Sequence, residues 1–585
     1  MKSFLRRLSM IAGVALLTAV TLSQFAAASS FQPDYGTENN TATGSDGMIV
    51  SAHPLASQVG LDVLESGGNA VDAAIAMQYA LTVTEPMMSG IGGGGFMMVY
   101  DAATKETTII NSRERAPGGA DPEMFLGDDG EPMDFEDRVI HGNSVGVPGT
   151  AAGLETSHNM WGTIAMHDLI APAIALAEEG FPIDDFLAGE IETHAEKLER
   201  SAASEVFFSE GNPLAEGDML VQPDLAHTLR MISEQGTDVF YNGEIAEAVA
   251  DTVQEFGGTL AVEDMQKYDV TIDEPVWGQY KDYDIATMPP PSSGGVFLLQ
   301  MLGILDGFDL SQYDIKSVEK YHLLAETMHL AYADRAEYAG DPEFVDVPVE
   351  GLLHPDYIEE RRNLISLDSV IENPEAGDVM PYQEDFERQG AVAQPGDRVD
   401  GQTTHYSVVD SYGNVVSYTT TIEQVFGSGI MVPEYGFLLN NELTDFDAEP
   451  GGANEVQPNK RPLSSMTPTI VFNDGQPVLT VGSPGGQTII TSVLQTILNT
   501  YEYDLPLEDA LNEPRIFTNN PDNYLHEEGI PEDVISQLND MGHGFTDEPA
   551  PIGNVSSIMY DPDEGIYTGS TDENRNGASF GLELE

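Results

Sequence analysis

The chain of 585 residues contains no cysteine. Disulfide bonds, thiol nucleophiles and a lipid-modified cysteine are therefore all excluded. Basic residues are also scarce, with 23 Lys and Arg against 98 Asp and Glu, and the formal net charge at pH 7 is -75. Proteins that bind nucleic acid neutralise its phosphates with Lys and Arg, so we expect no nucleic-acid partner.

The acidic residues are spread along the chain and do not form a tail, while hydrophobic residues still make up 41% of the sequence. This combination is typical of a folded protein and not of a disordered one. Repulsion among so many like charges destabilises a compact state unless salt screens it, and the Debye length falls to about 3 Å at about 1 M salt. We therefore interpret the composition as an adaptation to a saline habitat.

Long apolar runs are absent as well. Three basic residues, an apolar run of about 13 residues and the small residues Ala26-Ala27-Ala28 follow one another at the N-terminus, which is the layout of a secretory signal. A membrane-spanning helix needs about 20 apolar residues. We expect a signal peptide over residues 1–28, export to the periplasm or the cell exterior, and no membrane association after the signal is removed.

The first half of the remaining chain is mostly helical in pattern. Apolar spacing predicts two helices over residues 53–84, separated at Gly67-Gly68. Residues 96–117 have the pattern of a hairpin that turns near Ala103-Thr104. Residues 151–340 have mostly helical patterns, which we interpret as an outer helical layer.

The second half begins with a polar segment rich in Pro and Gly, residues 373–402, which indicates an exposed and mobile connection. From Thr403 the pattern is strongly β, including residues 436–446 and a hairpin that turns at residues 473–475. A helix follows over residues 485–500. Sheets covered by helical layers are the expected result.

Three short motifs match functional patterns without the context that those patterns require. "GIGGGG" at residues 90–95 matches a dinucleotide fingerprint, but a β pattern follows it where the fingerprint needs a helix. "GNSVG" at residues 142–146 matches a nucleophile elbow, but Pro148-Gly149 follow it where that motif also needs a helix. "DENRNGASFGLE" at residues 572–583 matches a calcium loop but has no exit helix. We interpret the first as a glycine-rich turn, and we expect neither a calcium site nor a nucleophile at Ser144.

His322, Glu326 and His329 lie at spacings of four and three residues on one face of an expected helix. Such a face can hold a metal ion. The spacing is also typical of a half-buried amphipathic helix, which is the interpretation we favour. We therefore expect no metal site and no cofactor.

Thr403 follows the polar connection directly. A threonine hydroxyl becomes a nucleophile only when a base removes its proton, and the threonine's own α-amino group can be that base. The pKa of an α-amino group, about 7.7 to 8.0, suits proton transfer at neutral pH. Within an unbroken chain the nitrogen of Thr403 is an amide, so cleavage between Gln402 and Thr403 would activate the enzyme.

Thr421 is the expected partner of Thr403. If the hairpin turns at Tyr412, the two threonines are equally far from its centre and lie opposite each other. The Cβ atoms of opposite residues are about 4.5 to 5.5 Å apart, so the Thr421 hydroxyl can orient the nucleophile or its amine. A cross-strand pair that only stabilises the hairpin explains the spacing equally well.

Several longer segments carry a family resemblance. "TTHYSVVDSYGN", "NNELTDF", "PNKRPLSSMTPTIV" and "GSPGG" follow residue 402, and "AVDAAIA", "SGIGGGGFM", "SRERAP" and "LAYADRAEYAGDP" precede it. Together they resemble the γ-glutamyltranspeptidase (glutathione hydrolase) family of N-terminal-nucleophile hydrolases over nearly the whole chain. The resemblance implies an α+β fold, a four-layer αββα sandwich. It also implies autocleavage into a large subunit, residues 29–402, and a small subunit, residues 403–585, which remain associated as a heterodimer.

The resemblance implies a role for each matching residue. Thr403 is the nucleophile of cleavage and catalysis, Thr421 is its hydrogen-bonding partner, and the N-H groups of Gly485 and Gly486 form the oxyanion hole. The other matching residues bind the substrate's α-carboxylate (Arg113, Ser464 and Ser465) and its α-amino group (Glu423, Glu442 and Asp445). A structural ion pair is the alternative role for Arg113.

The implied reaction transfers the γ-glutamyl group of glutathione or another γ-glutamyl compound, through an ester on Thr403, to water or to an amino acid or peptide acceptor. Glu423 and Glu442 stand where many family members have amides, so the resemblance does not fix the preference for an acceptor over water. The segment after Asp445 is shorter than in members with a lid, and we therefore expect an open cleft that admits larger substrates such as poly-γ-glutamate.

Two other functions are compatible with parts of this pattern. An acylase for glutaryl or cephalosporin-type amides would share the nucleophile but would leave the three carboxylates without an ammonium group. An exported binding protein would keep the fold without turnover.

Overall fold

The computed structural model describes residues 39–584 except 128, 384–385, 387–401 and 547. The expected secretory signal and most of the expected connection before Gln402 lie outside the described residues. Among the described helices, none is both long enough and apolar enough to cross a membrane.

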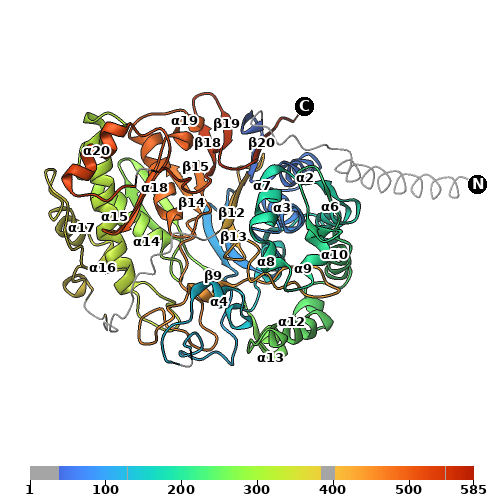
Figure 1. The fold of residues 1–585 in the computed structure, drawn as a ribbon. Coiled ribbons are helices and arrows are strands. Elements are labelled where there is room, and N and C mark those ends of the chain that lie inside the picture. Colours follow the sequence, from blue (N-terminus) through green and yellow to red (C-terminus); the bar gives the residue numbers. More distant parts are fainter. Residues whose placement is uncertain (1–38, 128, 384–385, 387–401, 547, 585) are drawn as a thin grey trace, which may run out of the picture.

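Two antiparallel sheets of seven strands each lie at the centre of the molecule (Figure 1). The strand order of the first sheet is β1 (Thr41–Gly44), β19 (Ile566–Thr571), β18 (Ser556–Asp561), β15 (Gln476–Gly482), β14 (Thr469–Asn473), β11 (Tyr283–Thr287) and β10 (Val276–Tyr280). The strand order of the second sheet is β20 (Ala578–Leu582), β2 (Gly47–Ser51), β12 (Thr403–Val409), β13 (Val415–Thr421), β3 (Gly94–Asp101), β4 (Glu106–Asn111) and β9 (Thr271–Asp273).

Helices cover the outer face of each sheet, as Figure 1 shows. The second sheet is covered by α2 (Pro54–Glu65), α3 (Ala70–Thr84), α5 (Thr150–Trp161), α6 (Met166–Glu179), α10 (Pro223–Gln235) and α12 (Glu244–Glu255). The first sheet is covered by α14 (Gly294–Leu305), α15 (Val318–Tyr338), α17 (Pro355–Arg362), α18 (Thr488–Tyr501), α19 (Leu507–Asn512) and α20 (Glu532–Met541). The expected four-layer αββα sandwich is confirmed.

Alternation along the strands explains how one sheet serves two layers, because successive side chains of a strand point to opposite faces. In β12, Tyr406 and Val408 pack into the core shared with α2 and α3. Val409 and Val415 of the same hairpin pack instead between the sheets, beside Phe472 of β14. Apolar residues on both faces of β12 and β13 therefore bury both strands of this hairpin completely.

Most of the expected elements are confirmed: the helix pair at residues 53–84, the hairpins β3–β4 and β14–β15, and the helix that becomes α18. The expectation of an outer helical layer over residues 151–340 is wrong at residues 271–287. There β9 is a strand of the second sheet, and β10 and β11 are strands of the first sheet. These strands have only three to five residues each, and β9 and β10 lie at sheet edges. Such short strands, partly exposed at an edge, give a weak periodic signal.

Two other expectations need correction. Residues 436–446 contain the 3-10 helix η6 (Glu442–Asp445) and no strand. The side chain of Asn440 binds the backbone of distant segments instead, with Nδ2 donating to Gly92 O at 2.7 Å and to Gly146 O at 2.9 Å. In the described part of the connection expected to be exposed, Val379 and Phe386 are buried in the core beneath α14 and α15. Two apolar side chains thus anchor part of that segment.

Candidate functional site

The hairpin of β12 and β13 places Thr403 directly opposite Thr421, as a turn at Tyr412 predicts. Thr403 Oγ1 donates a hydrogen bond to Thr421 Oγ1 at 3.4 Å. Thr421 Oγ1 in turn donates to the carbonyl oxygen of Gln402 at 2.8 Å and accepts from the backbone N-H of Glu423 at 2.8 Å. The Thr421 hydroxyl therefore links the nucleophile candidate to the carbonyl of the peptide bond that precedes it.

Thr404 points to the opposite face of the sheet. Its Oγ1 donates to Glu85 Oε2 at 2.7 Å, at the C-terminal end of α3, and burial raises the pKa of Glu85 above its usual range. Thr403, by contrast, lines a cavity of about 330 Å³. Strand alternation thus separates the two adjacent threonines, one into the helix-covered core and one towards open space.

Arg575 holds the other side of the Gln402–Thr403 bond, and sequence reasoning missed it. Its Nη1 donates to the carbonyl oxygen of Thr403 at 2.9 Å, and its Nη2 donates to Gln402 Oε1 at 2.7 Å. Arg575 lies in the segment "DENRNG" just before β20. The available signal was the scarcity of basic residues in this chain. Because so few are present, each arginine could have been considered as a residue with a specific partner.

Two glycine turns border the hairpin. In the "GIGGGG" segment, a Cβ atom at Gly93 would lie 2.0 Å from the carbonyl oxygen of Thr421, so only glycine fits there, and β3 begins at Gly94. Gly485 and Gly486 connect β15 to α18 with φ angles of +124° and +55°, a region that favours glycine. Among the described residues, neither amide N-H of this pair donates a hydrogen bond, and Gly486 lines the same cavity as Thr403.

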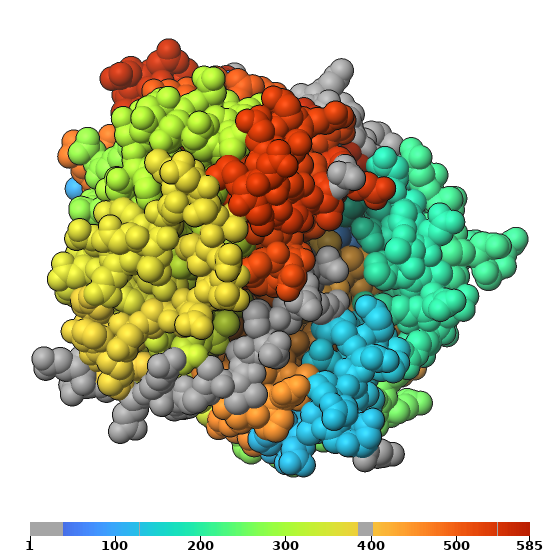
Figure 2. All heavy atoms as spheres, turned by 60° about the vertical axis from the view of Figure 1, so that its left-hand side comes forward, coloured from blue at the N-terminus to red at the C-terminus, as the bar shows by residue number. Residues whose placement is uncertain are grey.

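The cavity wall brings together most of the residues expected at the site. Its lining includes Thr403, Thr421, Glu423, Glu442, Asp445, Arg113, Ser464, Ser465 and Gly486. Part of the rim comes from two segments far apart in the sequence, near residues 115–140 and 440–460, which share a small apolar cluster. Figure 2 shows these segments, blue and orange, side by side at the surface.

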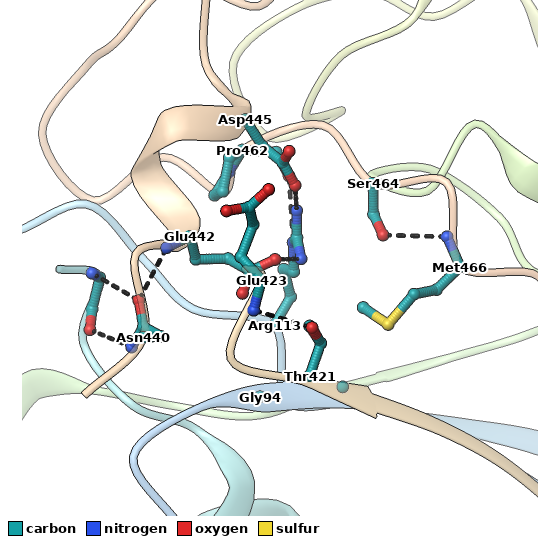
Figure 3. Close-up of polar contacts among 12 residues, drawn as sticks. Gly94, Arg113, Thr421, Glu423, Asn440, Glu442, Asp445, Pro462, Ser464 and Met466 are labelled. Atoms are coloured by element: carbon teal, nitrogen blue, oxygen red, sulfur yellow. Dashed lines mark hydrogen bonds and ion pairs between the residues drawn. The ribbon is translucent and has the colours of Figure 1, made fainter. Parts of the chain in front are cut away.

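Arg113 is already engaged by protein groups (Figure 3). Its guanidinium donates to Glu442 Oε1, to Asp445 Oδ2 at 2.6 Å, and to the carbonyl oxygens of Pro462 and Leu463 at 3.3 and 2.9 Å. Arg113 and Glu442 are buried, whereas Asp445 is 35% exposed. The residue expected to grip the substrate carboxylate and two residues expected around its ammonium group therefore pair with one another in this structure.

A buried acid lies behind this pair. Burial raises the pKa of Glu114 to about 7, although Arg113 opposes the rise, and burial also raises the pKa of Glu442 well above its usual range. The charge of Asp445 adds to both rises, because a nearby like charge disfavours ionisation. The cluster therefore holds fewer negative charges at neutral pH than its carboxylates suggest.

Glu423 has a left-handed backbone, with φ of +80°, which is uncommon for a residue other than glycine. Its carbonyl accepts the N-H of Gln402 at 2.7 Å, and its side chain accepts hydrogen bonds from Asn441, from Thr444 at 3.3 Å and from Gln424 at 2.8 Å. The chain thus bends after β13 so that Glu423 lies beside both Gln402 and the cavity.

Arg335 of α15 is a second cavity arginine that sequence reasoning missed. Its Nη2 donates to Ser465 Oγ at 3.0 Å and its Nε donates to Ser293 Oγ at 2.8 Å. Arg335 forms no direct ion pair with a described residue, and Ser465 lies beside it in the cavity wall. The Ser464 hydroxyl instead accepts the N-H of Met466 at 3.1 Å (Figure 3).

The discounted motifs have structural roles in the described residues. Ser144 lies in the 3-10 helix η3 (Gly142–Ser144), is buried, and donates to the carbonyl oxygens of Val139 and His141. The helix face of His322 and Glu326 is fully buried and not half-buried, which corrects the expectation, and His543 joins it from another part of the chain.

A family model described as Gamma-glutamyltranspeptidase matches residues 56–582. A protein named glutathione hydrolase proenzyme from Bacillus subtilis (strain 168) is 61% identical over 570 residues, which cover 97% of each chain. A protein of the same name from Escherichia coli (strain K12) is 40% identical over 588 residues, again 97% of each chain. The crystal structure of a cephalosporin acylase from Bacillus halodurans has a TM-score of 0.83 at 28% identity, covering 94% of this chain and 98% of that one.

Proposed function

The chain belongs to the γ-glutamyltranspeptidase family, and we propose that it cleaves the γ-glutamyl amide bond of glutathione and related compounds with Thr403 as the nucleophile. The observation that carries this proposal is the hydrogen-bonded pair of Thr403 and Thr421 on the wall of a cavity that also contains Arg113 and three carboxylates. Water or the amino group of an amino acid or peptide accepts the γ-glutamyl group.

The chain is a proenzyme that cuts itself before Thr403. Thr403 Oγ1 attacks the carbonyl carbon of Gln402, the bond to the Thr403 nitrogen breaks, and that nitrogen takes up a proton as an ester forms on Oγ1. Water then hydrolyses the ester and leaves residue 402 as a new carboxyl terminus. The Thr421 hydroxyl, 2.8 Å from the Gln402 carbonyl oxygen, supports the negative charge that develops there. The products are a large subunit, residues 29–402, and a small subunit, residues 403–585.

The same hydroxyl serves catalysis after the cut. The free α-amino group of Thr403 removes the proton of Oγ1, which attacks the γ-carbonyl carbon of the substrate. The oxyanion binds the unpaired N-H groups of Gly485 and Gly486, and the leaving amine takes the proton. Water or an acceptor amine then opens the γ-glutamyl ester on Thr403.

The donor's α-amino group and α-carboxylate meet opposite charges in the cavity. Glu423 and Asp445 suit an ammonium group, while Arg335, Ser465 and Ser464 form a cationic and hydroxyl-bearing corner for the carboxylate. Arg113 reaches the carboxylate only after exchanging one of its present carboxylate partners. The open cleft expected from the short segment after Asp445 extends the substrate range to γ-linked polymers, including poly-γ-glutamate.

An acylase is the second candidate, because a cephalosporin acylase shares the fold. The glutathione hydrolase proenzyme of Bacillus subtilis, at 61% identity, is more similar in sequence than this acylase, at 28%, and than a protein named Acylase ACY 1 proenzyme from Pseudomonas sp. (strain SE83), at 38%. The α-amino group of a γ-glutamyl donor also offers a positive partner to Glu423 and Asp445 in the cavity wall, which an acylase substrate without that group does not. These observations favour γ-glutamyl compounds.

Thr403→Ala and native protein, compared on a denaturing gel and with a chromogenic γ-glutamyl amide, test the proposal. Native protein is expected to give two bands and release of the chromophore, and the variant one band and none. A single uncut band for both proteins would contradict the proposal. The signal at residues 1–28 further supports export to the periplasm or the cell exterior, and the net charge of -75 supports a saline habitat.

A further inference from the structure

A second group of chemically active side chains lies away from the catalytic hairpin, in the first half of α15. The ligand atoms of His322, Glu326 and His543 all lie within 4.8 Å of one another, and all three residues are buried. His329 lies one turn further along α15, and its Nδ1 is 3.4 Å from Glu326 Oε1. Three of the chain's 12 histidines thus gather around one buried carboxylate.

Each of these side chains has one polar atom held by a neighbour and the other directed into the cluster. His322 Nε2 is bound to the carbonyl oxygen of Ser366 at 2.7 Å, and Glu326 Oε2 accepts the N-H of Ile371 at 2.7 Å. His329 Nε2 is bound to Thr518 Oγ1 at 2.9 Å, and His543 Nδ1 to the Tyr524 hydroxyl at 3.4 Å. Metal ligands are typically oriented by an outer set of partners in this way.

The charge of Glu326 is not balanced by a strong cation. Among the described residues, no hydrogen bond reaches Glu326 Oε1, and its ion-pair partner is His329, with neither Lys nor Arg in contact. A buried carboxylate without a strong cation is costly, because burial removes its water and the Ile371 N-H compensates only one of its two oxygens. A cation among the four side chains would provide that partner.

We propose that His322, Glu326 and His543 bind one divalent transition metal ion of the Zn²⁺ class, with His329 beside Glu326 as the nearest side chain for a fourth position. Imidazole nitrogens with one carboxylate suit Zn²⁺, whereas Ca²⁺ and Mg²⁺ prefer oxygen ligands. His322 Nδ1 and His543 Nε2 are now 2.8 Å apart, as a hydrogen-bonded pair. Tetrahedral ligands at zinc distances are about 3.3 Å apart, so the two rings need to separate by only about half an ångström.

The site would tie together three parts of the helical layer. His322, Glu326 and His329 come from α15, His543 follows the end of α20, and the loop that contains Ser366 and Ile371 orients two of the ligands. Three protein ligands leave one position of a tetrahedral zinc ion, which a shift of the His329 ring towards Glu326 would fill. Along α15, Glu326 precedes the cavity residue Tyr332 by about 9 Å, and none of His322, Glu326 and His543 lines the cavity, so the site is distinct from the catalytic one.

A metal-free cluster is the competing explanation. In that case His543 donates to His322 through Nε2, and Glu326 shares a proton with His329. Zinc binding to the full chain distinguishes the two. Native protein is stripped with a chelator, dialysed, and titrated with Zn²⁺ alone, and the metal that remains bound after gel filtration is measured by atomic spectroscopy.

We expect one tightly bound Zn²⁺ per chain and a higher midpoint of thermal unfolding with zinc than without. His543→Gln is expected to lose this bound zinc, and Tyr524→Phe, which removes only an orienting hydroxyl, to bind it about 10- to 100-fold more weakly. His526→Gln is the matched control, because His526 packs against the same Phe545 ring as His543 but lies outside the cluster. It is expected to bind zinc as the native protein does.

Hydrolysis of the chromogenic γ-glutamyl amide shows whether each variant is folded, since no residue of the cluster lines the cavity. If His543→Gln does not fold, the zinc affinity of Tyr524→Phe is compared with that of His526→Gln, and weaker binding by Tyr524→Phe alone supports the proposed site. Native protein that retains no zinc would overturn the proposal. Zinc retained equally by native protein and by the folded cluster variant would also overturn it, because that zinc would be bound elsewhere on the surface.

Discussion

Replacing Thr421 by valine tests how the hairpin performs self-cleavage. Valine keeps the shape of threonine but removes Oγ1, which donates to the Gln402 carbonyl and accepts from Thr403 Oγ1 and from the N-H of Glu423. Loss of one donor to a developing oxyanion slows a reaction about 10²- to 10³-fold, or about 2.7 to 4 kcal/mol in the barrier. The unpaired N-H of Glu423 costs about 1 to 3 kcal/mol of stability. We therefore expect slow processing in a moderately destabilised fold.

The assay is a time course of the uncut and cut bands on a denaturing gel, with thermal unfolding measured on the same samples. Thr420→Val is the matched control, since Thr420 is the preceding residue of β13 and its hydroxyl donates to Gly94 O at 3.1 Å on the other face. The control is expected to lose stability but to be cut at the native rate. Equal rates for Thr421→Val and native protein, or equal slowing in both variants, would refute the reasoning.

Three further predictions concern charge. Glu114→Gln removes an acid whose pKa is raised to about 7 in the folded protein. Between about pH 4.5 and pH 7 the folded protein keeps a proton on Glu114 that the unfolded chain has released, so the folded protein loses stability as the pH rises through this range. The variant's unfolding midpoint should therefore gain on the native one between pH 5 and pH 8, and a constant difference would contradict this. Arg575→Met removes the donors to Thr403 O and Gln402 Oε1, and we expect it to slow self-cleavage about tenfold or more. A denaturing gel measures the rate, and cleavage at the native rate would count against a positioning role for Arg575. Finally, the unfolding midpoint should rise between low salt and about 1 M NaCl, because salt screens a net charge of -75, and an unchanged midpoint would exclude the saline interpretation.

The catalytic hairpin was predictable because both of its signals are local. Alternating β-branched residues define β12 and β13, and symmetry about Tyr412 fixes the pairing of Thr403 with Thr421. Spacing alone did not distinguish a catalytic pair from a structural one. The family resemblance, and the position of Thr403 on the cavity wall, favour the catalytic role that we propose.

Contacts between distant segments were not predictable. Arg575 reaches Thr403 across more than 170 positions of sequence, and His543 reaches His322 across more than 220. The pairing of Arg113 with Glu442 is similar, since composition predicts that an arginine has an acidic partner but not which of the acids it is. Residues 436–446 were misassigned for a related reason, because the contacts of Asn440 with Gly92 and Gly146 override the local β pattern.

The central claim is that Thr403 carries the γ-glutamyl group. Native protein is mixed with a γ-glutamyl donor, quenched in acid during turnover, digested and analysed by mass spectrometry. We predict that the peptide that begins at Thr403 has a free N-terminus and carries one γ-glutamyl group as an ester on its first residue. A modified peptide that begins elsewhere, or an unmodified Thr403 during active turnover, would contradict the account.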